Sequence, residues 1–194
     1  MAAPLTLDPS HSAVLIMDYQ NDILGRLGAA AQGLLDRATT VLTSARAAGA
    51  PIIYVVVQFR PGYPEVSPRS PTFAAIKGSG RMLEGTPGAA IHTQVAPRAE
   101  DVVVTKRRVG AFSTTDLQTV LRARELTTLI LLGVSTSGVV LSTVRWAADA
   151  DYDLVVVEDG CLDGDDEVHR MLTQKVFPRQ AQVVSAAEVC AALA

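Results

Sequence analysis

Polar side chains follow five apolar runs of this sequence, each at the point where a strand is expected to end. They are Asp18, Gln58, Lys106, Ser135 and Asp159. In a doubly wound parallel sheet, ligands bind outside the carboxyl ends of the strands. Any one of these residues alone is ordinary, because charged groups commonly end strands. We expect the five to converge on one rim and form a polar site.

Two of these residues have complementary chemistry. Asp18 follows the apolar run 14–17, and a carboxylate at the mouth of such a strand is partly desolvated, which raises its pKa and suits it to proton transfer. Lys106 follows the run 102–105 and can hold Asp18 ionised or stabilise negative charge on a substrate. On spacing alone, two strand-end charges facing water are the commoner arrangement.

The elements that would position these residues follow an alternating pattern. The apolar runs predict six strands, at residues 13–17, 52–57, 102–105, 129–132, 154–157 and 182–184. Several runs are continuously apolar, as expected for parallel strands covered on both faces. Helices are predicted between them, at about residues 29–48, 115–124, 139–150, 166–174 and 186–193. This alternation predicts a single α/β domain over residues 1–194, a three-layer sandwich with a six-stranded parallel sheet.

Two helix ends carry clear local signals. Gly49 follows the first long helical segment, and glycine readily takes the left-handed conformation at a helix end. Ser185 and Glu188 have the spacing of a capping box, which satisfies free amide groups at a helix start.

Residues 60–98 interrupt the alternation. This stretch holds six of the ten prolines and five of the fourteen glycines, and its apolar periodicity fades. A long irregular segment in a compact domain is usually functional or mobile. We expect a lid or a subunit contact; the alternative is a plain surface excursion with a short helix near 71–77.

Four segments, in this order, resemble motifs of the isochorismatase-like (cysteine hydrolase) family. They are Asp18-Tyr19-Gln20-Asn21-Asp22, the stretch from Lys106 to Leu117 with its Gly110-Ala111-Phe112, Gly133-Val134-Ser135-Thr136 followed by Val139, and the strand Tyr152 to Asp159. The resemblance spans about residues 12–184. It implies the same α/β fold and a hydrolase that needs no cofactor.

The resemblance also implies roles for individual residues. Asp18 would be the general acid or base and Lys106 its charged partner, with Gln58, Phe112, Ser135 and Val139 lining the substrate pocket. Family members often have a non-proline cis peptide in the third motif, which here would join Val134 to Ser135. Backbone amides near that motif would stabilise an oxyanion.

Val139 is the departure from the family pattern. Most members carry a nucleophilic cysteine at this point, and a valine side chain cannot form a covalent intermediate. Isochorismatases also lack the cysteine: their aspartate protonates the vinyl ether of isochorismate, and water completes hydrolysis to pyruvate and a dihydroxy-cyclohexadiene acid. Gln58-Phe59-Arg60-Pro61-Gly62 is similar to the glutamine-proline-glycine found in those enzymes. The zinc site of nicotinamidases is not expected, because its aspartate-x-histidine pair is missing here.

Three alternatives remain open. Ser135 could be a nucleophile, with Asp159 and His169 following in serine-hydrolase order, although the second glycine of Gly-x-Ser-x-Gly is missing. Cys161 follows a predicted strand and could supply a displaced thiol, although a small buried cysteine is the commoner state. The chain could also be a non-catalytic relative that binds a small carboxylate.

The composition and charge of the chain limit the kinds of partner that we expect. The net charge is −3 and no basic run is visible, so we expect a small-molecule substrate and no nucleic-acid partner. The apolar runs are too short to span a membrane. Cys161 and Cys190 form neither a disulfide framework nor a metal cluster, so we expect no metal and a cytoplasmic location. From the resemblance we expect a homo-oligomer, either a dimer or a tetramer.

Overall fold

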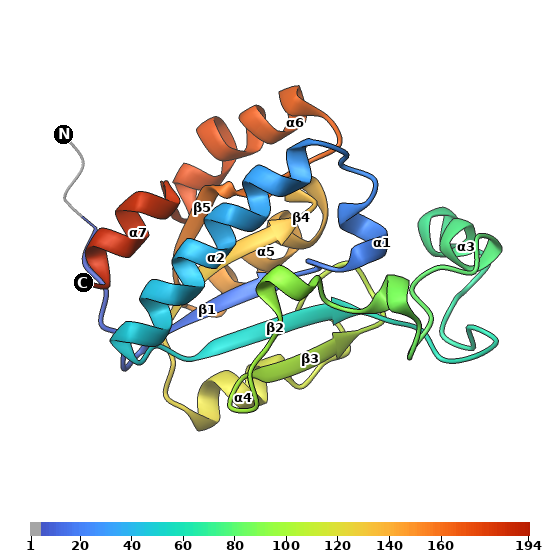
Figure 1. Ribbon diagram of the computed structural model, residues 1–194, viewed down its shortest axis with the longest axis horizontal. Coiled ribbons are helices and arrows are strands. Elements are labelled where there is room, and N and C mark those ends of the chain that lie inside the picture. Colours follow the sequence, from blue (N-terminus) through green and yellow to red (C-terminus); the bar gives the residue numbers. More distant parts are fainter. Residues whose placement is uncertain (1–4) are drawn as a thin grey trace.

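The computed structural model, which describes residues 5–194, is built around a sheet of six parallel strands in the order β3-β2-β1-β4-β5-β6 (Figure 1). The strands are β1 (Ser12–Met17), β2 (Ile52–Val57), β3 (Val102–Lys106), β4 (Thr128–Val134), β5 (Asp153–Leu162) and β6 (Gln182–Val184). The fold class predicted from the sequence is confirmed. The chain reverses its direction of travel across the sheet between β1 and β4, and this is where a doubly wound sheet opens a crevice for ligands.

Helices cover both faces of the sheet (Figure 1). On one face, α2 (Ala30–Ala48) and α7 (Ala186–Ala192) pack against strand side chains that include Val14 and Ile16. On the other face, α4 (Leu117–Ala123) and α5 (Leu141–Asp149) pack against Leu15 and Met17, among others. Successive strand side chains point to opposite faces, so two covered faces require continuously apolar strands.

Both helix-end signals have the expected geometry. Gly49 follows α2 with a φ of 77°, in the left-handed region. Ser185 accepts a hydrogen bond from the amide of Glu188, and the Glu188 carboxylate accepts one from the amide of Ser185. This reciprocal cap starts α7 beside the end of β6.

The strands and helices differ from the predictions at the edge where the site was expected. β5 continues to Leu162 instead of ending near Val157, because its pairing with β4 resumes at Gly133 and Cys161 after a register shift. A π-helical turn, Thr136–Val140, precedes α5, and a second one, Leu172–Val176, follows α6 (Asp166–Met171). The short helix α1 (Asn21–Leu24) was not predicted from the sequence.

The irregular segment 60–98 carries α3 (Pro71–Gly78) and two short 3-10 turns, Pro87–Ala89 and Thr93–Val95. Figure 1 shows α3 projecting beyond the carboxyl ends of the strands. A small hydrophobic cluster joins this segment to the end of β2; it is made of Val57, Phe59, Tyr63, Phe73 and Met82. Its role as a lid or subunit contact remains a prediction.

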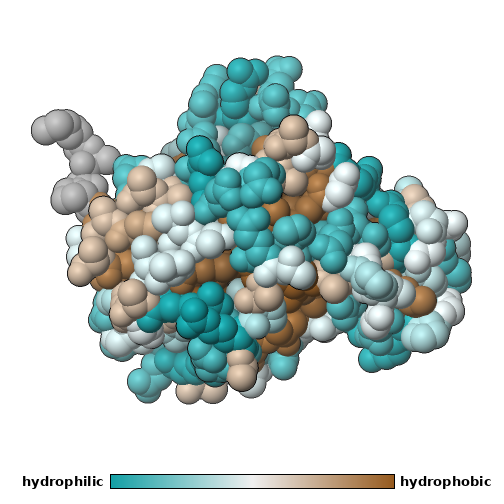
Figure 2. Space-filling view, in the orientation of Figure 1, coloured by the Kyte–Doolittle hydropathy of each residue, from teal (hydrophilic) through white to brown (hydrophobic). Residues whose placement is uncertain are grey.

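The surface of the molecule carries both polar and apolar side chains. Figure 2 shows hydrophilic side chains spread over the face that carries α2, with apolar side chains visible mainly in the recesses between elements. Within residues 5–194, none of the helices is both long enough and apolar enough to cross a membrane.

Candidate active site

Asp18 and Lys106 form a buried ion pair at the carboxyl edge of the sheet. The distance from Lys106 Nζ to Asp18 Oδ2 is 2.8 Å, and the two residues are 2% and 4% exposed, respectively. The structure therefore brings together the two residues that the sequence singled out for proton transfer. It excludes the alternative of two strand-end charges facing water.

Strand register explains how the pair forms. β2 lies between β1 and β3, and Val57 at its end is paired with Lys106, so the long lysine side chain must reach past β2 to meet Asp18. Asp18 itself adopts a φ of 62°, an uncommon conformation for a residue other than glycine. Its amide donates to the carbonyl of Val55, which holds this turn at the end of β1.

The surroundings of Asp18 act on the pKa of its carboxyl in opposite directions. Burial raises the pKa of the Asp18 carboxyl above its ordinary value, and the neighbouring Lys106 offsets part of that effect. Asp18 Oδ1 is buried and has no hydrogen-bond partner. One oxygen is thus anchored by Lys106, while the other is left for a proton that can be transferred.

Gln20 positions the end of β2, a role that the sequence analysis did not assign. Its side chain is fully buried; Nε2 donates to the carbonyls of Val57 (2.9 Å) and Ala89 (2.7 Å), and Oε1 accepts from the amide of Val57 (2.8 Å). The glutamine in the first family motif was the sequence signal that could have revealed this role. It ties the strand next to Asp18 to the segment that follows α3.

Asn21 and Asp22 hold the same segment. Asn21 Nδ2 donates to the carbonyl of Pro87, and Asp22 Oδ2 accepts from the amide of Met82 at 3.2 Å. Gly88 lies directly against this carboxylate, because a Cβ atom on Gly88 would come 2.2 Å from Asp22 Oδ1. The first motif therefore fastens residues 82–89 over the rim.

This close approach predicts that Gly88→Ala is destabilising. The new methyl group must displace the Asp22 carboxylate, so we expect a loss of about 1–3 kcal/mol in the free energy of unfolding, measured by urea denaturation. Gly78→Ala is the matched control: it ends α3, has open space around the added Cβ, and should be neutral or slightly stabilising. Equal stability of the two variants would contradict this packing.

Gln58 lies beside the ion pair, and its side chain contacts the segment 82–89 that lies over the rim. Its backbone N–H donates to the carbonyl of Lys106 at 3.3 Å, and its side-chain Nε2 donates to the carbonyl of Ala89 at 3.1 Å. Gln58 and Gln20 thus share one acceptor. The predicted contact between Gln58 and a substrate stays a prediction.

Ser135 and Val139 lie on the turn that follows β4, next to the end of β1. The Val134–Ser135 peptide bond is cis, as the resemblance implied. A Cβ atom on Gly138 would lie 2.6 Å from Ser135 Oγ, so the hydroxyl group sits close over the π-helical turn. Val139 is 2% exposed and belongs to the hydrophobic cluster on the α5 side of the sheet. Its position is compatible with a pocket wall, and that role stays a prediction.

Asp159, which was predicted at the rim, and Phe112, which was predicted to line the pocket, contact other residues. Asp159 lies within β5 and points to the α2 and α7 side, where its carboxylate binds Arg37 Nε (2.7 Å) and caps α7 at the amide of Ala186 (2.7 Å). The prediction that it joins the polar site is wrong, because β5 continues past it. The ring of Phe112 stacks on Trp146 of α5 with centroids 3.9 Å apart and lies 6.2 Å from the ring of Tyr152. Its role in lining the pocket stays a prediction.

The alternative with Ser135 as nucleophile lacks the hydrogen bonds that would link serine, histidine and aspartate. His169 Nδ1 lies 2.8 Å from the hydroxyl of Thr136, the neighbour of Ser135, and Asp159 is engaged with Arg37. No hydrogen bond joins Ser135 Oγ to His169 within residues 5–194. The chain order of serine, aspartate and histidine is present, but the side chains do not assemble into a triad.

Cys161 is a buried thiol. It is 2% exposed, and burial raises its pKa to about 12, so the thiol is protonated at neutral pH. Its Sγ lies 3.7 Å from the carbonyl of Leu131 within the sheet. Burial within the sheet is the common environment of a packed cysteine.

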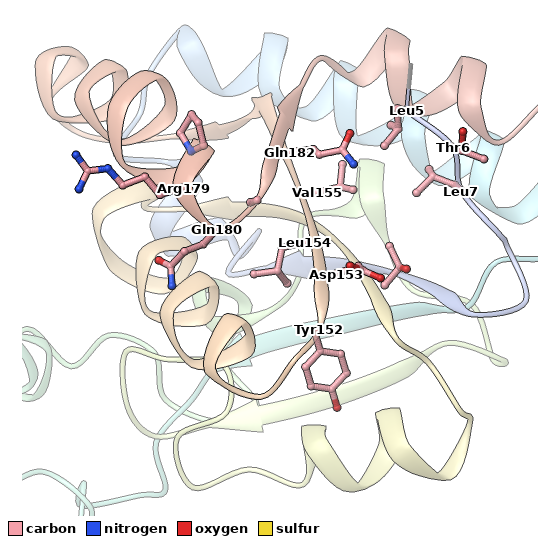
Figure 3. A pocket seen from close by; sticks show the side chains of 13 residues that line it. Leu5, Thr6, Leu7, Tyr152, Asp153, Leu154, Val155, Arg179, Gln180 and Gln182 are labelled. Carbon is pink, nitrogen blue, oxygen red and sulfur yellow. The ribbon is translucent and has the colours of Figure 1, made fainter. Parts of the chain in front are cut away.

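No cluster of three or more histidine, cysteine or acidic residues with metal-binding geometry occurs in the described part of the chain. A cavity of about 520 Å³ lies at the opposite edge of the sheet, around Leu7, Tyr152 and Gln182 (Figure 3). It is lined by the start of β5 and therefore does not communicate with the rim that carries Asp18.

Comparison with known proteins gives a family match over most of the chain. Residues 12–188 match the isochorismatase domain family. The chain is 33% identical over 177 residues to the ureidoacrylate amidohydrolase RutB of Rhizobium rhizogenes, covering 80% of this chain and 72% of the relative. An isochorismatase family protein from Burkholderia thailandensis shares the fold with a TM-score of 0.85 and 29% identity, over 98% of this chain and 99% of that one.

A cysteine hydrolase from Pseudomonas syringae pv. phaseolicola has a TM-score of 0.89 at 23% identity, over 100% of this chain and 98% of that one, which speaks for the fold alone. The family match covers both the strand that leads to Asp18 and the turn that carries Val139. The relatives include a protein that is named a ureidoacrylate amidohydrolase. The chain therefore belongs to the isochorismatase family of hydrolases.

Proposed function

We propose that this protein hydrolyses a small molecule by proton transfer from Asp18, assisted by Lys106, without a thiol nucleophile at position 139. The observation that carries the proposal is the state of the Asp18 carboxyl: buried, with a raised pKa, anchored through Oδ2 and unpartnered at Oδ1. Such a group is suited to general acid catalysis. Val139 offers no competing chemistry.

The reaction that uses this arrangement most directly is hydrolysis of a vinyl ether of the isochorismate type. The Asp18 carboxylic acid gives its proton to the terminal carbon of the enol ether, and the electron pair of the double bond forms the new C–H bond. Water adds to the resulting oxocarbenium carbon, and the hemiketal breaks its C–O bond to release pyruvate and an alcohol. Lys106 stabilises the carboxylate that remains after proton transfer, and a proton lost from the added water restores the acid.

Amide hydrolysis is the second candidate, supported by the similarity to a ureidoacrylate amidohydrolase. In this version Asp18 would act as the base and the nucleophile would be water, Ser135 or Cys161. The burial of Cys161 and the missing serine relay favour water among these three.

A product assay separates the two reactions. The wild-type protein is incubated with isochorismate, followed by detection of pyruvate, and with a panel of small amides that includes ureido acids, followed by detection of ammonia. Pyruvate without ammonia supports the vinyl-ether reaction, and ammonia alone overturns it. If neither product forms, a carboxylate-binding role without turnover replaces the proposal. The homo-oligomer and the cytoplasmic location remain predictions, measurable by light scattering and by cell fractionation.

We expect Cys161→Ala to keep its activity. If the thiol takes no part in the reaction, kcat/KM of the variant should stay within about twofold of the wild-type value, while the loss of a packed sulfur lowers stability by about 1 kcal/mol. Activity on the best substrate of the panel and thermal unfolding are measured side by side. A fall in activity of a hundredfold or more with an intact fold would return the thiol to the mechanism.

A further inference from the structure

Two side chains from the segment after β5 bind the π-helical turn that follows β4. His169 Nδ1 lies 2.8 Å from the hydroxyl oxygen of Thr136, and Asp163 Oδ2 accepts a hydrogen bond from the amide of Ser137 at 2.7 Å. The contacts join residues that are 33 and 26 positions apart in the chain. His169 and Asp163 therefore hold the turn from outside the site, and the proton transfer proposed above uses neither of them.

The hydroxyl group of Thr136 depends on His169. Thr136 is fully buried, and a buried hydroxyl group without a hydrogen-bond partner is costly. The neighbouring Val139 and Val140 belong to the hydrophobic cluster on the α5 side of the sheet, so packing alone does not require a hydroxyl group in this turn. Among residues 5–194, His169 Nδ1 is the side-chain partner of this hydroxyl.

The helix that carries His169 is itself fixed. Asp165 caps α6 by accepting hydrogen bonds from two of its first amides. At the other end of the helix, Thr173 Oγ1 lies 3.1 Å from the carbonyl oxygen of His169 and 2.9 Å from Glu158 Oε1 of β5. The imidazole ring is thus attached to the sheet through α6, and the turn is attached to the imidazole ring.

A shift of the turn would move Ser135 with it. The carbonyl of Ser135 accepts a hydrogen bond from the amide of Gly138 at 3.2 Å, and a Cβ atom on Gly138 would come 2.6 Å from Ser135 Oγ. Ser135 lies two residues beyond Gly133, which is paired with Met17, the residue directly before Asp18. The turn therefore connects His169 to a residue beside the acid.

We propose that His169 is a positioning residue for the reaction at Asp18. Through Thr136 it fixes the turn, and the turn fixes the distance between the Asp18 carboxyl and a substrate atom held beside Ser135. π-helical turns are rare and frequently occur at functional sites. A misplacement of about 1 Å can lower a reaction rate by about a hundredfold. The effect on turnover rests on the proposed function, whereas the contact between His169 and Thr136 does not.

The test compares two replacements of His169. In His169→Asn the side-chain amide takes the place of Nδ1 and can bind Thr136, whereas in His169→Gln the longer side chain puts its amide in the place of Nε2. We expect His169→Gln to lower kcat by about 10–100-fold and to leave KM within about twofold, because geometry is lost while substrate still binds. His169→Asn should restore kcat to within about threefold of the wild-type value.

The rates are measured by pyruvate release from isochorismate, or by ammonia release from the amide of the panel that is hydrolysed. Thr136→Val removes the same hydrogen bond from the other side and should lower kcat as His169→Gln does, so a single unfolded variant does not decide the result. Arg170→Gln changes the exposed neighbour of His169 on α6 and is the matched control, with unchanged kcat.

Hydrogen exchange of the full chain gives a readout that needs no turnover. In His169→Gln, the amides of residues 136–140 should exchange at least about tenfold faster than in the wild type, because the turn opens more readily. The amides of β1 should be unchanged, which separates this local effect from a general loss of stability. His169→Asn should exchange as the wild type does.

The outcomes separate this role from the proposed function. Wild-type kcat in His169→Gln, equal losses of kcat in both variants of His169, or a change in KM alone overturns the positioning role, and the proposed function stands if turnover still requires Asp18. In a protein that releases neither pyruvate nor ammonia, faster exchange in His169→Gln but not in His169→Asn supports the hold on the turn and overturns the proposed function. Unchanged exchange in His169→Gln overturns the hold on the turn.

Discussion

Replacing Asp18 with asparagine is expected to lower kcat by about 10²–10⁴-fold, the usual contribution of a positioned general acid. Asparagine keeps the shape of the side chain but has no acidic proton, and Oδ2 is the oxygen that Lys106 anchors. The measurement is product release under saturating substrate, with circular dichroism to verify the fold. Asp116→Asn removes an exposed carboxylate at the start of α4 and serves as the control.

The pH profile adds a readout that a loss of structure would not reproduce. If the protonated form of Asp18 is the active form, wild-type activity falls as the pH rises through the folded-state pKa of Asp18. Burial raises that pKa, so the fall should occur at higher pH than for an exposed aspartate. An activity that instead increases with pH through this range would identify Asp18 as a base and favour the amide reaction. Full activity of Asp18→Asn would remove Asp18 from the chemistry.

Replacing Lys106 with methionine is expected to cost about 3–5 kcal/mol of stability at neutral pH, because it leaves the Asp18 carboxylate buried without its partner. The pKa of Asp18 rises further in this variant. The folded protein then binds a proton that the unfolded chain has lost, so stability falls as the pH rises above the unfolded-state pKa and is regained as the pH is lowered. Urea denaturation at two pH values, such as 7 and 5, measures both effects.

Two further variants make this result specific to the ion pair. The double variant Asp18→Asn with Lys106→Met removes both charges, and it should be more stable at neutral pH than Lys106→Met alone. Lys77→Met removes an exposed lysine in the last turn of α3 and should change stability little. Equal stability of the double and single variants, or no recovery at acid pH, would contradict the buried pair.

Much of the fold is predictable because its causes are local. Continuous apolar runs specified parallel strands covered on both faces, and all six were found. Gly49 and the pair Ser185 and Glu188 marked helix ends through backbone preferences that act within one turn. The end of β5 was predicted too early, because the pairing that extends it comes from Gly133 on another strand.

The candidate site was also predictable only in part. The sequence by itself determined that Asp18 and Lys106 each lie at the end of a strand, since strand ends can be read from hydrophobicity. Only the tertiary structure decided that Lys106 reaches past β2 to Asp18 and that Asp159 turns to Arg37. It alone also joins His169 to the buried hydroxyl group of Thr136. Partners of this kind are chosen by distances and burial among residues far apart in the chain, and neither is encoded in local spacing.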